Sequence, residues 1–171
     1  MLRNFAFSGI FFAVLQCGGC GTHYVAPTSG SIAKVTIESR VDSELAIAIF
    51  DDANECFTSH GAAALEPGQS TELSVVAGHP LAMHFQQRDI SNFPTVTTCD
   101  LIITWKPMNG GQYKSVMYKT KDGCAANVRE IVAGSGSYRR IPFVGRKATP
   151  PVGFTHKWCA ALTDEQKALL H

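Results

Sequence analysis

Histidines are the first candidates for chemistry in this sequence, because imidazoles bind metals and transfer protons. Six histidines are scattered along the 171 residues, at positions His23, His60, His79, His84, His156 and His171. No two of them have the spacing of a shared metal site, so the sequence predicts neither a bound metal nor a cofactor. His84 falls on the polar side of an alternating pattern, and we predict that it is a solvent-facing or edge residue.

Acidic and amide side chains form a second cluster with possible chemistry, consisting of Asp51, Asp52, Asn54 and Glu55. Oxygen-rich loops of this kind can bind calcium, but this one lacks the spacing of an EF-hand. We therefore predict a solvated turn, and calcium binding is the alternative.

Motifs for covalent or phosphate chemistry are missing from the sequence. It contains no GxSxG elbow and no P-loop, and the glycine- and serine-rich segment 134–137 lacks the lysine of a phosphate cradle. We therefore predict no catalytic residue and no enzyme. The alternative, an envelope hydrolase, requires a pocket that brings His60 or His156 close to Asp51 or Asp52.

The first two cysteines follow an apolar N-terminal run. One positive charge at Arg3 precedes this run, which is shorter than the roughly 20 residues of a membrane-spanning helix. The layout is that of a secretory signal peptide. Cys17 and Cys20 also form a CxxC motif, but redox motifs of this type begin a helix after a strand, and this sequence context has no such unit.

The residues around Cys20 resemble the lipobox of bacterial lipoproteins, in which the signal is cut before a cysteine that is then lipidated. Gly18 and Gly19 precede Cys20 and suit this motif, whereas the bulky Gln16 precedes Cys17. Cleavage before Cys17 would also leave Cys20 as an odd thiol in an oxidising compartment. We therefore predict lipidation of Cys20, with Cys17 as the alternative, and attachment to the membrane through this lipid.

From Ile32 onward the hydrophobic pattern has a period of two residues, which is typical of strands. Such segments lie near residues 32–38, 45–49, 73–75, 81–85, 99–105, 113–119 and 125–132. Turn-forming glycine and proline residues separate them. About seven short strands without βαβ alternation predict an all-β fold, namely an antiparallel β-sandwich.

The pattern divides the chain into three parts. Residues 1–19 are predicted to be the signal peptide, 20–31 the lipidated cysteine and a flexible tether, and 32–171 one β-sandwich domain. Glycine and proline are frequent in 133–157, which predicts an irregular C-terminal arm with a short edge strand near Tyr138–Val144. Thr163 and Gln166 form a capping-box pattern, which predicts one short terminal helix.

Four cysteines remain after Cys20, and they allow three disulfide connectivities: Cys56, Cys99, Cys124 and Cys159. Cys99 and Cys124 flank one strand–turn–strand unit, so we favour that pair. Cys56 would then bond to Cys159 and tie the C-terminal arm to the sandwich. Disulfides of this kind are typical of an envelope compartment.

The charges are balanced in total but not along the chain. The formal net charge is +1, which argues against a dedicated nucleic-acid binder. Ten acidic and two basic residues lie between Glu38 and Asp100, whereas ten basic and two acidic residues lie between Lys106 and Lys157. Either strands of the two halves interleave and their charges pair, or the domain has a basic face. On the second interpretation the partner-binding residues are Arg139, Arg140, Arg146, Lys147 and Lys157.

Several turns and aromatic residues form a longer pattern between Leu65 and Ile131. It runs through Pro67-Gly68, Val76-Ala77-Gly78-His79-Pro80-Leu81, Cys99, Trp105-Lys106-Pro107, Gly110-Gly111-Gln112-Tyr113 and Cys124. This pattern resembles a group of small uncharacterised proteobacterial outer-membrane lipoproteins with sandwich domains. The resemblance implies the fold and a place at the outer membrane, facing the periplasm, and it implies no activity.

The sequence thus predicts a lipid-anchored envelope protein with a binding or scaffolding role. The partners that suit a basic, aromatic surface are an envelope protein, an anionic glycan or a lipid headgroup. One alternative is a subunit of an envelope secretion, pilus or transport assembly. The oligomeric state and the identity of the partner do not follow from the sequence.

Overall fold

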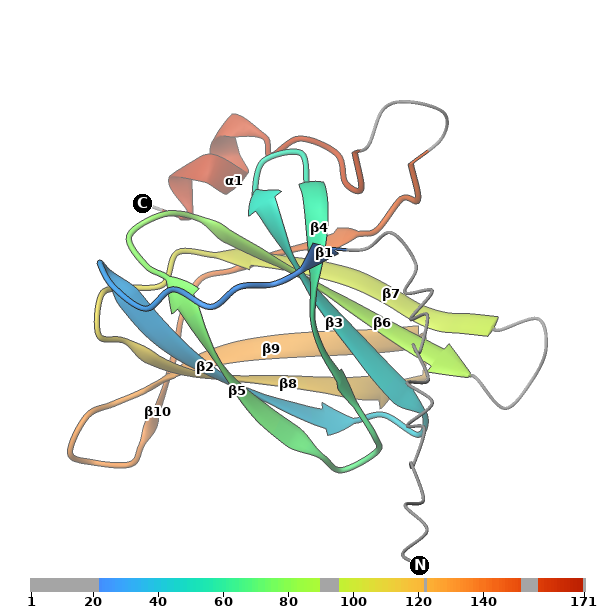
Figure 1. The fold of residues 1–171 in the computed structure, drawn as a ribbon, viewed down its shortest axis with the longest axis horizontal. Helices are drawn as coiled ribbons and strands as arrows, with labels where there is room; N and C mark the ends of the chain where they lie inside the picture. The colour runs from blue at the N-terminus through green and yellow to red at the C-terminus, as the bar shows by residue number, and fades with distance from the viewer. Residues whose placement is uncertain (1–21, 90–95, 122, 152–156, 171) are drawn as a thin grey trace, which may run out of the picture.

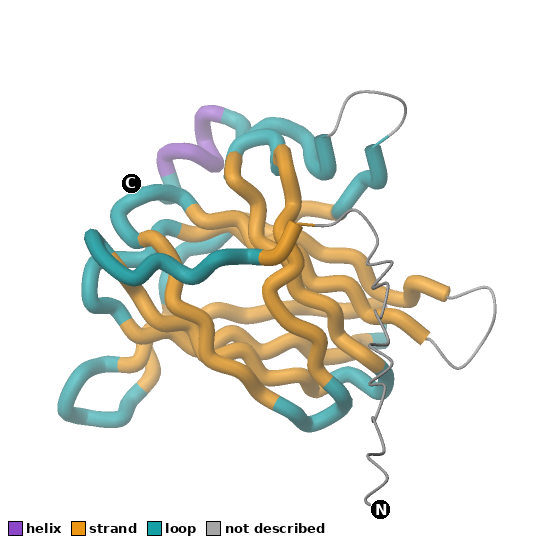
Figure 2. The backbone as a smooth tube through the Cα atoms, in the orientation of Figure 1, coloured by secondary structure: helices purple, strands orange, loops and turns teal. Residues whose placement is uncertain are grey.

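The computed structural model of the chain describes residues 22–89, 96–121, 123–151 and 157–170, and these form an all-β sandwich (Figures 1 and 2). One sheet has the order β1 (Thr22–His23), β4 (Phe57–Leu65), β3 (Glu44–Asp52), β6 (Leu81–Asp89), β7 (Val96–Trp105) and β11 (Val144–Lys147). The other has the order β10 (Tyr138–Arg140), β9 (Gly123–Ile131), β8 (Gln112–Thr120), β2 (Ile32–Arg40) and β5 (Ser70–Val76). The predicted fold class is confirmed. The signal peptide, Cys17 and Cys20 lie outside the described residues.

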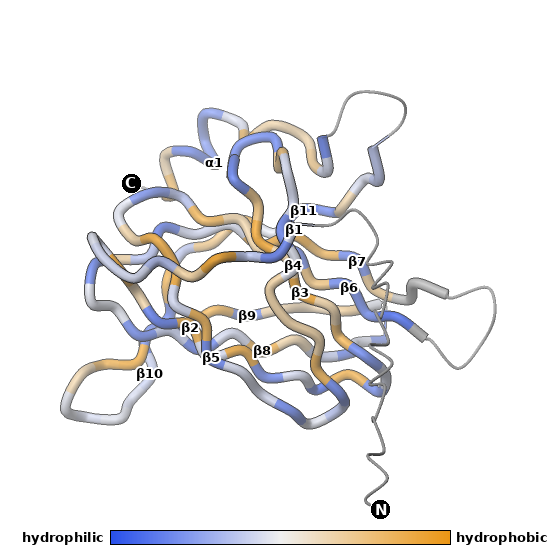
Figure 3. The backbone as a smooth tube through the Cα atoms, in the orientation of Figure 1, coloured by the Kyte–Doolittle hydropathy of each residue, from blue (hydrophilic) through white to orange (hydrophobic). Residues whose placement is uncertain are grey.

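The core lies between the two sheets and follows the predicted alternation. Val35 and Ile37 of β2 are fully buried, whereas the outward-facing Lys34 is exposed. Hydrophobic and hydrophilic residues alternate in the same way along several strands (Figure 3). Trp105 of β7 and Tyr113 of β8 meet edge to face across the core, with ring centroids 6.4 Å apart. Burial of such large apolar surfaces drives the two sheets together.

Two strand pairs are parallel, although the sequence predicts an antiparallel sandwich. The pair that matters most is β2 with β8, in register from Lys34 opposite Gln112 to Arg40 opposite Tyr118. The other is the short pair of β1 with β4. Parallel neighbours need a long connection, and between β2 and β8 the chain crosses to the other sheet and back twice, with β5 between the two crossings. The parallel pairing places an acidic part of the sequence beside a basic part.

Strand β4 was not among the predicted strands. Its sequence Phe-Thr-Ser-His-Gly-Ala-Ala-Ala-Leu lacks regular alternation and is rich in alanine, which is depleted in strands. The strand forms because β3 supplies a ladder of backbone partners, with a shift of register between Ile47 and Ala48. Tertiary pairing here overrides local propensity.

The N-terminal part of the predicted tether is bound to the domain. Thr22 and His23 pair with His60 and Gly61, and the Tyr24 amide donates to the Gly61 carbonyl over 2.9 Å. The Tyr24 hydroxyl donates to the backbone oxygen of Ser74 of β5, also over 2.9 Å. The chain is therefore attached to the sandwich from Thr22 onward.

Both predicted disulfides are present. Cys99 and Cys124 connect β7 with β9, and therefore one sheet with the other, with Cα atoms 5.8 Å apart. Cys56 and Cys159 connect the β3–β4 turn with the C-terminal arm, with Cα atoms 5.5 Å apart. The second bridge closes a separation of 103 residues, which in the chain-entropy treatment stabilises the fold by about 4.7 kcal/mol.

The arm contributes one strand to each sheet and then the predicted helix. β10 extends the five-stranded sheet and β11 extends the six-stranded sheet, where the sequence predicts a single edge strand. The helix α1 (Asp164–Ala168) lies at one end of the sandwich (Figure 1) and has the predicted capping box between Thr163 and Gln166. None of the helices in the described part of the chain is long and apolar enough to cross a membrane.

Candidate functional site

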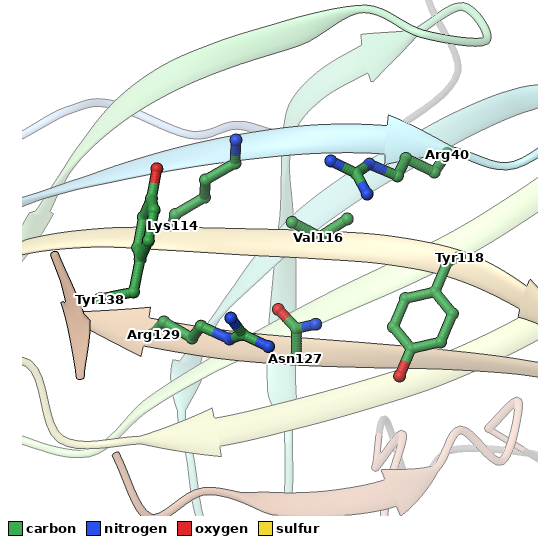
Figure 4. A pocket seen from close by; sticks show the side chains of 7 residues that line it. All are labelled: Arg40, Lys114, Val116, Tyr118, Asn127, Arg129 and Tyr138. Atoms are coloured by element: carbon green, nitrogen blue, oxygen red, sulfur yellow. The ribbon is translucent and has the colours of Figure 1, made fainter. Parts of the chain in front are cut away.

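A groove of about 400 Å³ lies on the outer face of the five-stranded sheet. It is lined by the residues labelled in Figure 4, namely Arg40, Lys114, Val116, Tyr118, Asn127, Arg129 and Tyr138. They come from β2, β8, β9 and β10 and face outward because their sequence neighbours fill the core. In β8, for example, Tyr113, Ser115 and Met117 are buried between the sheets. We call this hollow the cationic groove.

Three cations lie in one row beside and within the cationic groove. Lys114 of β8 is the register partner of Arg129 of β9, and Arg129 is the register partner of Arg140 of β10. Like charges that lie directly opposite one another destabilise a sheet. Among the described residues, no carboxylate forms an ion pair with Arg129 or Arg140. The row therefore leaves positive charge at Arg129 and Arg140 uncompensated, and an anion could bind there.

Among the described residues, Glu38 is the only acidic residue within ion-pair distance of the cations that line the groove, Arg40, Lys114 and Arg129. One of its carboxylate oxygens lies 2.6 Å from the Lys114 ammonium, and the other contacts the Arg40 guanidinium. The hydrogen bond from Arg40, and after it the one from Lys114, lowers the pKa of Glu38 below its ordinary value. The carboxylate is thus charged at neutral pH, and it orients Lys114 and Arg40 but pairs with neither Arg129 nor Arg140.

Uncharged groups complete the lining. Tyr138 stands beside Lys114 at one end of the groove, and Tyr118 lies at the other end (Figure 4). Between them, Asn127 offers an amide that can both donate and accept. The cations of the groove can bind an anionic group of a ligand, and the tyrosine rings can pack against a flat ring that carries this group. The lining contains no serine, cysteine or histidine, and its guanidinium, ammonium, amide and phenol groups supply contacts suited to binding an anion.

Four of the five predicted partner-binding cations are exposed, but they belong to different sheets. Arg139 and Arg140 lie on β10 at the edge of the five-stranded sheet, whereas Lys147 lies on β11 of the other sheet. Lys157 lies next to the β3–β4 turn, through a backbone bridge to Phe57. The structure does not bring these residues together into one face, and partner binding by each of them stays a prediction.

Two of these exposed cations are already engaged within the chain. The Arg139 guanidinium donates from Nε to a Glu130 carboxylate oxygen over 2.8 Å. The Lys157 ammonium lies 2.7 Å from a Glu55 carboxylate oxygen and 5.5 Å from the centre of the Phe57 ring. Exposed pairs of this kind contribute little to stability, so both side chains can exchange partners at low cost.

Arg146 does not belong to an exposed surface, contrary to the sequence prediction. Its side chain is only 8% exposed. One guanidinium nitrogen donates to the carbonyls of Asn54 and Ala160 over 2.6 and 2.9 Å, and the other to the Ala53 carbonyl and the Thr104 hydroxyl over 2.7 and 2.6 Å. Burial lowers the pKa of this guanidinium. Arg146 therefore holds the β3–β4 turn, β7 and the arm together.

The uneven charge distribution along the chain is compensated in part by pairing between its halves. Glu38 pairs with Lys114, and Asp42 lies 2.8 Å from the Lys119 ammonium. The pair between Glu55 and Lys157 also joins the acidic half to the basic half. The interleaving interpretation therefore holds for these residues.

The oxygen-rich turn uses its side chains for internal contacts. The Asp52 carboxylate accepts from the Glu55 amide over 2.6 Å, and the Asn54 side-chain oxygen accepts from the Leu162 amide over 3.1 Å. Within the residues that the structure describes, no group of three or more histidines, cysteines or carboxylates could hold a metal ion.

His60 contacts Asp51, one of the pairs named for the hydrolase alternative. The Nε2 atom of His60 lies 2.8 Å from an Asp51 carboxylate oxygen, and its Nδ1 atom lies 2.7 Å from the Thr22 hydroxyl. The contact with Thr22 fastens β1 to β4 and the contact with Asp51 joins β4 to β3, and none of these residues lines the cationic groove. His156 lies outside the described residues.

The fold and its surface define a disulfide-bonded, all-β protein with a cationic groove on one sheet. No model of a known protein family matches the chain, and no curated protein matches it either. The groove residues Arg40, Lys114 and Arg129 were not among the predicted site residues. Alternation along their strands predicts only that they face outward, because the pairing of β2 with β8 and of β8 with β9 is not local.

Proposed function

We propose that this protein is a lipid-anchored envelope protein whose sandwich domain binds an anionic ligand in the cationic groove. The observation that carries the proposal is the row formed by Lys114, Arg129 and Arg140 on three adjacent strands. Three adjacent like charges do not stabilise a sheet, whereas all three can stabilise a bound phosphate or carboxylate.

The ligand class follows from the lining of the groove. Guanidinium groups recognise phosphate and carboxylate through paired hydrogen bonds. The tyrosine rings of Tyr118 and Tyr138 add flat surfaces, which suit a ring such as a sugar. An anionic glycan or the headgroup of an anionic lipid combines both features.

The lipid anchor rests on the sequence, and two structural observations are consistent with it. All four cysteines from Cys56 onward are in disulfides, which form and persist outside the cytosol. The chain is attached to the sandwich from Thr22, which leaves only Gly21 between β1 and the predicted lipidated Cys20. An acyl chain on Cys20 would therefore hold the domain close to the leaflet and raise its effective concentration there.

Calorimetric titration of the detergent-extracted protein tests the groove. The probes are glycerol 1-phosphate and glucuronate, with glycerol as the uncharged control. We expect binding of the two anions, a loss of at least tenfold in affinity for Arg129→Ala, and no change for Lys147→Ala, which removes an exposed cation from the other sheet. Equal binding of glycerol, or an unchanged affinity of Arg129→Ala, would contradict the proposal.

The intact mass of the extracted protein, measured after alkylation with and without reduction, tests the anchor. We expect a chain that begins at Cys20 and carries acyl mass, with Cys56, Cys99, Cys124 and Cys159 alkylated only after reduction. A chain without acyl mass would refute the anchor and leave the groove to be judged by the titration.

A further inference from the structure

A second hollow, of about 490 Å³, lies on the outer face of the six-stranded sheet and shares no residue with the cationic groove. Its floor consists of small side chains on β3 and β4, bordered by longer ones on β6. The strand registers place Gly61, Ala48 and His84 in one row and Ala64, Ala46 and Gln86 in the next. We call this hollow the alanine trough.

His84 is the buried polar residue of the alanine trough. It is only 6% exposed, although it faces away from the core between the sheets. The sequence predicts a solvent-facing or edge residue at this position. That prediction is wrong, because Phe50 and Trp158 cover the ring, with centroids 5.9 and 5.4 Å from it.

The contacts of His84 leave one ring nitrogen for a ligand. Nε2 contacts the carboxylate of Asp100 on the neighbouring strand β7. Because a carboxylate only accepts hydrogen bonds, Nε2 is the donor of this pair. No residue in the described part of the chain forms a hydrogen bond with Nδ1. The imidazole thus has a fixed orientation and a second nitrogen that no described residue engages.

Trp158 forms a wall of the alanine trough and is held firmly in place. The next residue, Cys159, is bonded to Cys56, and the Trp158 amide donates to the Cys56 carbonyl over 3.2 Å. Cys56 and the β-branched Thr58 have left-handed backbone conformations, with φ of 55° and 48°. Such strained conformations persist only where the surrounding structure holds them, here at the Cys56–Cys159 bridge, and they are frequent at ligand sites.

The lining of the alanine trough is electrically neutral, unlike that of the cationic groove. Glu44 and Arg88 lie opposite one another in the β3–β6 register and balance each other. Arg88 donates from Nε to the side-chain oxygen of Gln86 over 2.6 Å, which leaves the Gln86 amide group with hydrogens to donate. The trough therefore favours a neutral, polar ligand.

We propose that the alanine trough binds a neutral saccharide, with one face of a sugar ring against Trp158 and its hydroxyl groups on His84 and Gln86. A pyranose ring has an apolar C–H face and a rim of hydroxyls, which matches an indole and alanine methyl groups bordered by an amide and an imidazole. The volume of the trough falls within the range of about 300–1,000 Å³ that is usual for small-ligand sites.

The emission of Trp158 provides the readout for a titration of the extracted protein. Trp105, the second tryptophan, is fully buried in the core, so a response to ligand reports on Trp158. The probes are four neutral trisaccharides: triacetylchitotriose, cellotriose, maltotriose and mannotriose. We expect at least one of them to shift the emission in a saturable way, and none of these shifts to depend on ionic strength.

Three variants with matched controls decide the outcome. Ala46→Leu fills the trough and should abolish the response, whereas the same change at the exposed Ala133 should not. Gln86→Ala removes the amide, should lower the affinity at least fivefold, and serves if Ala46→Leu fails to fold. Arg129→Glu should leave saccharide binding unchanged, which separates this site from the cationic groove. If no trisaccharide shifts the emission, or if Gln86→Ala and Ala46→Leu bind like the wild type, the proposal is overturned.

Discussion

Glu38 has two opposing effects at the residue scale. Its carboxylate holds Arg40 and Lys114 in position, and it also competes with any anion for the same two cations. Because these partners lower its pKa, its contribution to stability is fully present above its ordinary pKa of 4.5 and is lost as the pH falls through the lowered value in the folded protein. At neutral pH the competing charge is therefore always present.

The variant Glu38→Gln should bind glycerol 1-phosphate more tightly than the wild type. Removal of one nearby negative charge at the protein surface is expected to raise the affinity by about three- to tenfold. Calorimetric titration at pH 7 measures this change. Glu72→Gln is the matched control, because Glu72 pairs with Lys34 outside the cationic groove. A lower affinity of Glu38→Gln would contradict this expectation, because it would mean that Glu38 helps binding more by orienting the cations than it hinders binding by competing with the anion.

At the scale of elements, local patterns predicted some strands and the helix but not how they pair. Alternation located β2 and β8, and the capping box of Thr163 and Gln166 located α1. β4 has no such signal, since its alanines pack equally well in several local structures and only pairing with β3 makes it a strand. The cationic groove depends on the parallel pairing of β2 with β8, which no short segment of the sequence encodes.

Alternation also fails to tell a surface cation from a buried one on an edge strand. Arg146 and Lys147 are neighbours on β11, but only Arg146 is buried. The chain around Ala160 folds over the side of the strand on which Arg146 lies. The sequence placed both at the surface. The distinction depends on where the Cys56–Cys159 bridge holds the arm, which is a property of the folded chain.

The pair of neighbours gives a direct test of the role of Arg146. Arg146→Met keeps the length of the side chain but leaves the carbonyls of Ala53, Asn54 and Ala160 without this donor. Because an unsatisfied buried acceptor costs about 1–3 kcal/mol, we expect the free energy of unfolding to fall by about 2–4 kcal/mol in urea titrations. Lys147→Met should change it by less than about 0.5 kcal/mol. Equal effects of the two substitutions would show that the buried hydrogen bonds of Arg146 contribute no net stability.

At the scale of the whole molecule, the two disulfides support different surfaces. Cys99–Cys124 joins the two sheets, and the core and both outer faces depend on that connection. Cys56–Cys159 holds the arm against the outer face of the six-stranded sheet, where Trp158 covers His84. The cationic groove lies on the five-stranded sheet and receives no lining residue from beyond Tyr138. The two faces should therefore respond independently to loss of the second bridge.

The double variant Cys56→Ala/Cys159→Ala tests this independence. Loss of a bridge that closes 103 residues should lower the free energy of unfolding by about 4–5 kcal/mol. In the protein that remains folded, Trp158 should move away from His84, so its emission should shift to longer wavelength while the fully buried Trp105 stays unchanged. Affinity for glycerol 1-phosphate should stay within twofold of the wild type, because the backbone ladders of β2, β8, β9 and β10 do not depend on the Cys56–Cys159 bridge. If anion binding disappeared while circular dichroism still showed a folded sandwich, the two faces would be coupled through the arm, and the cationic groove could not be treated as a site built by one sheet alone.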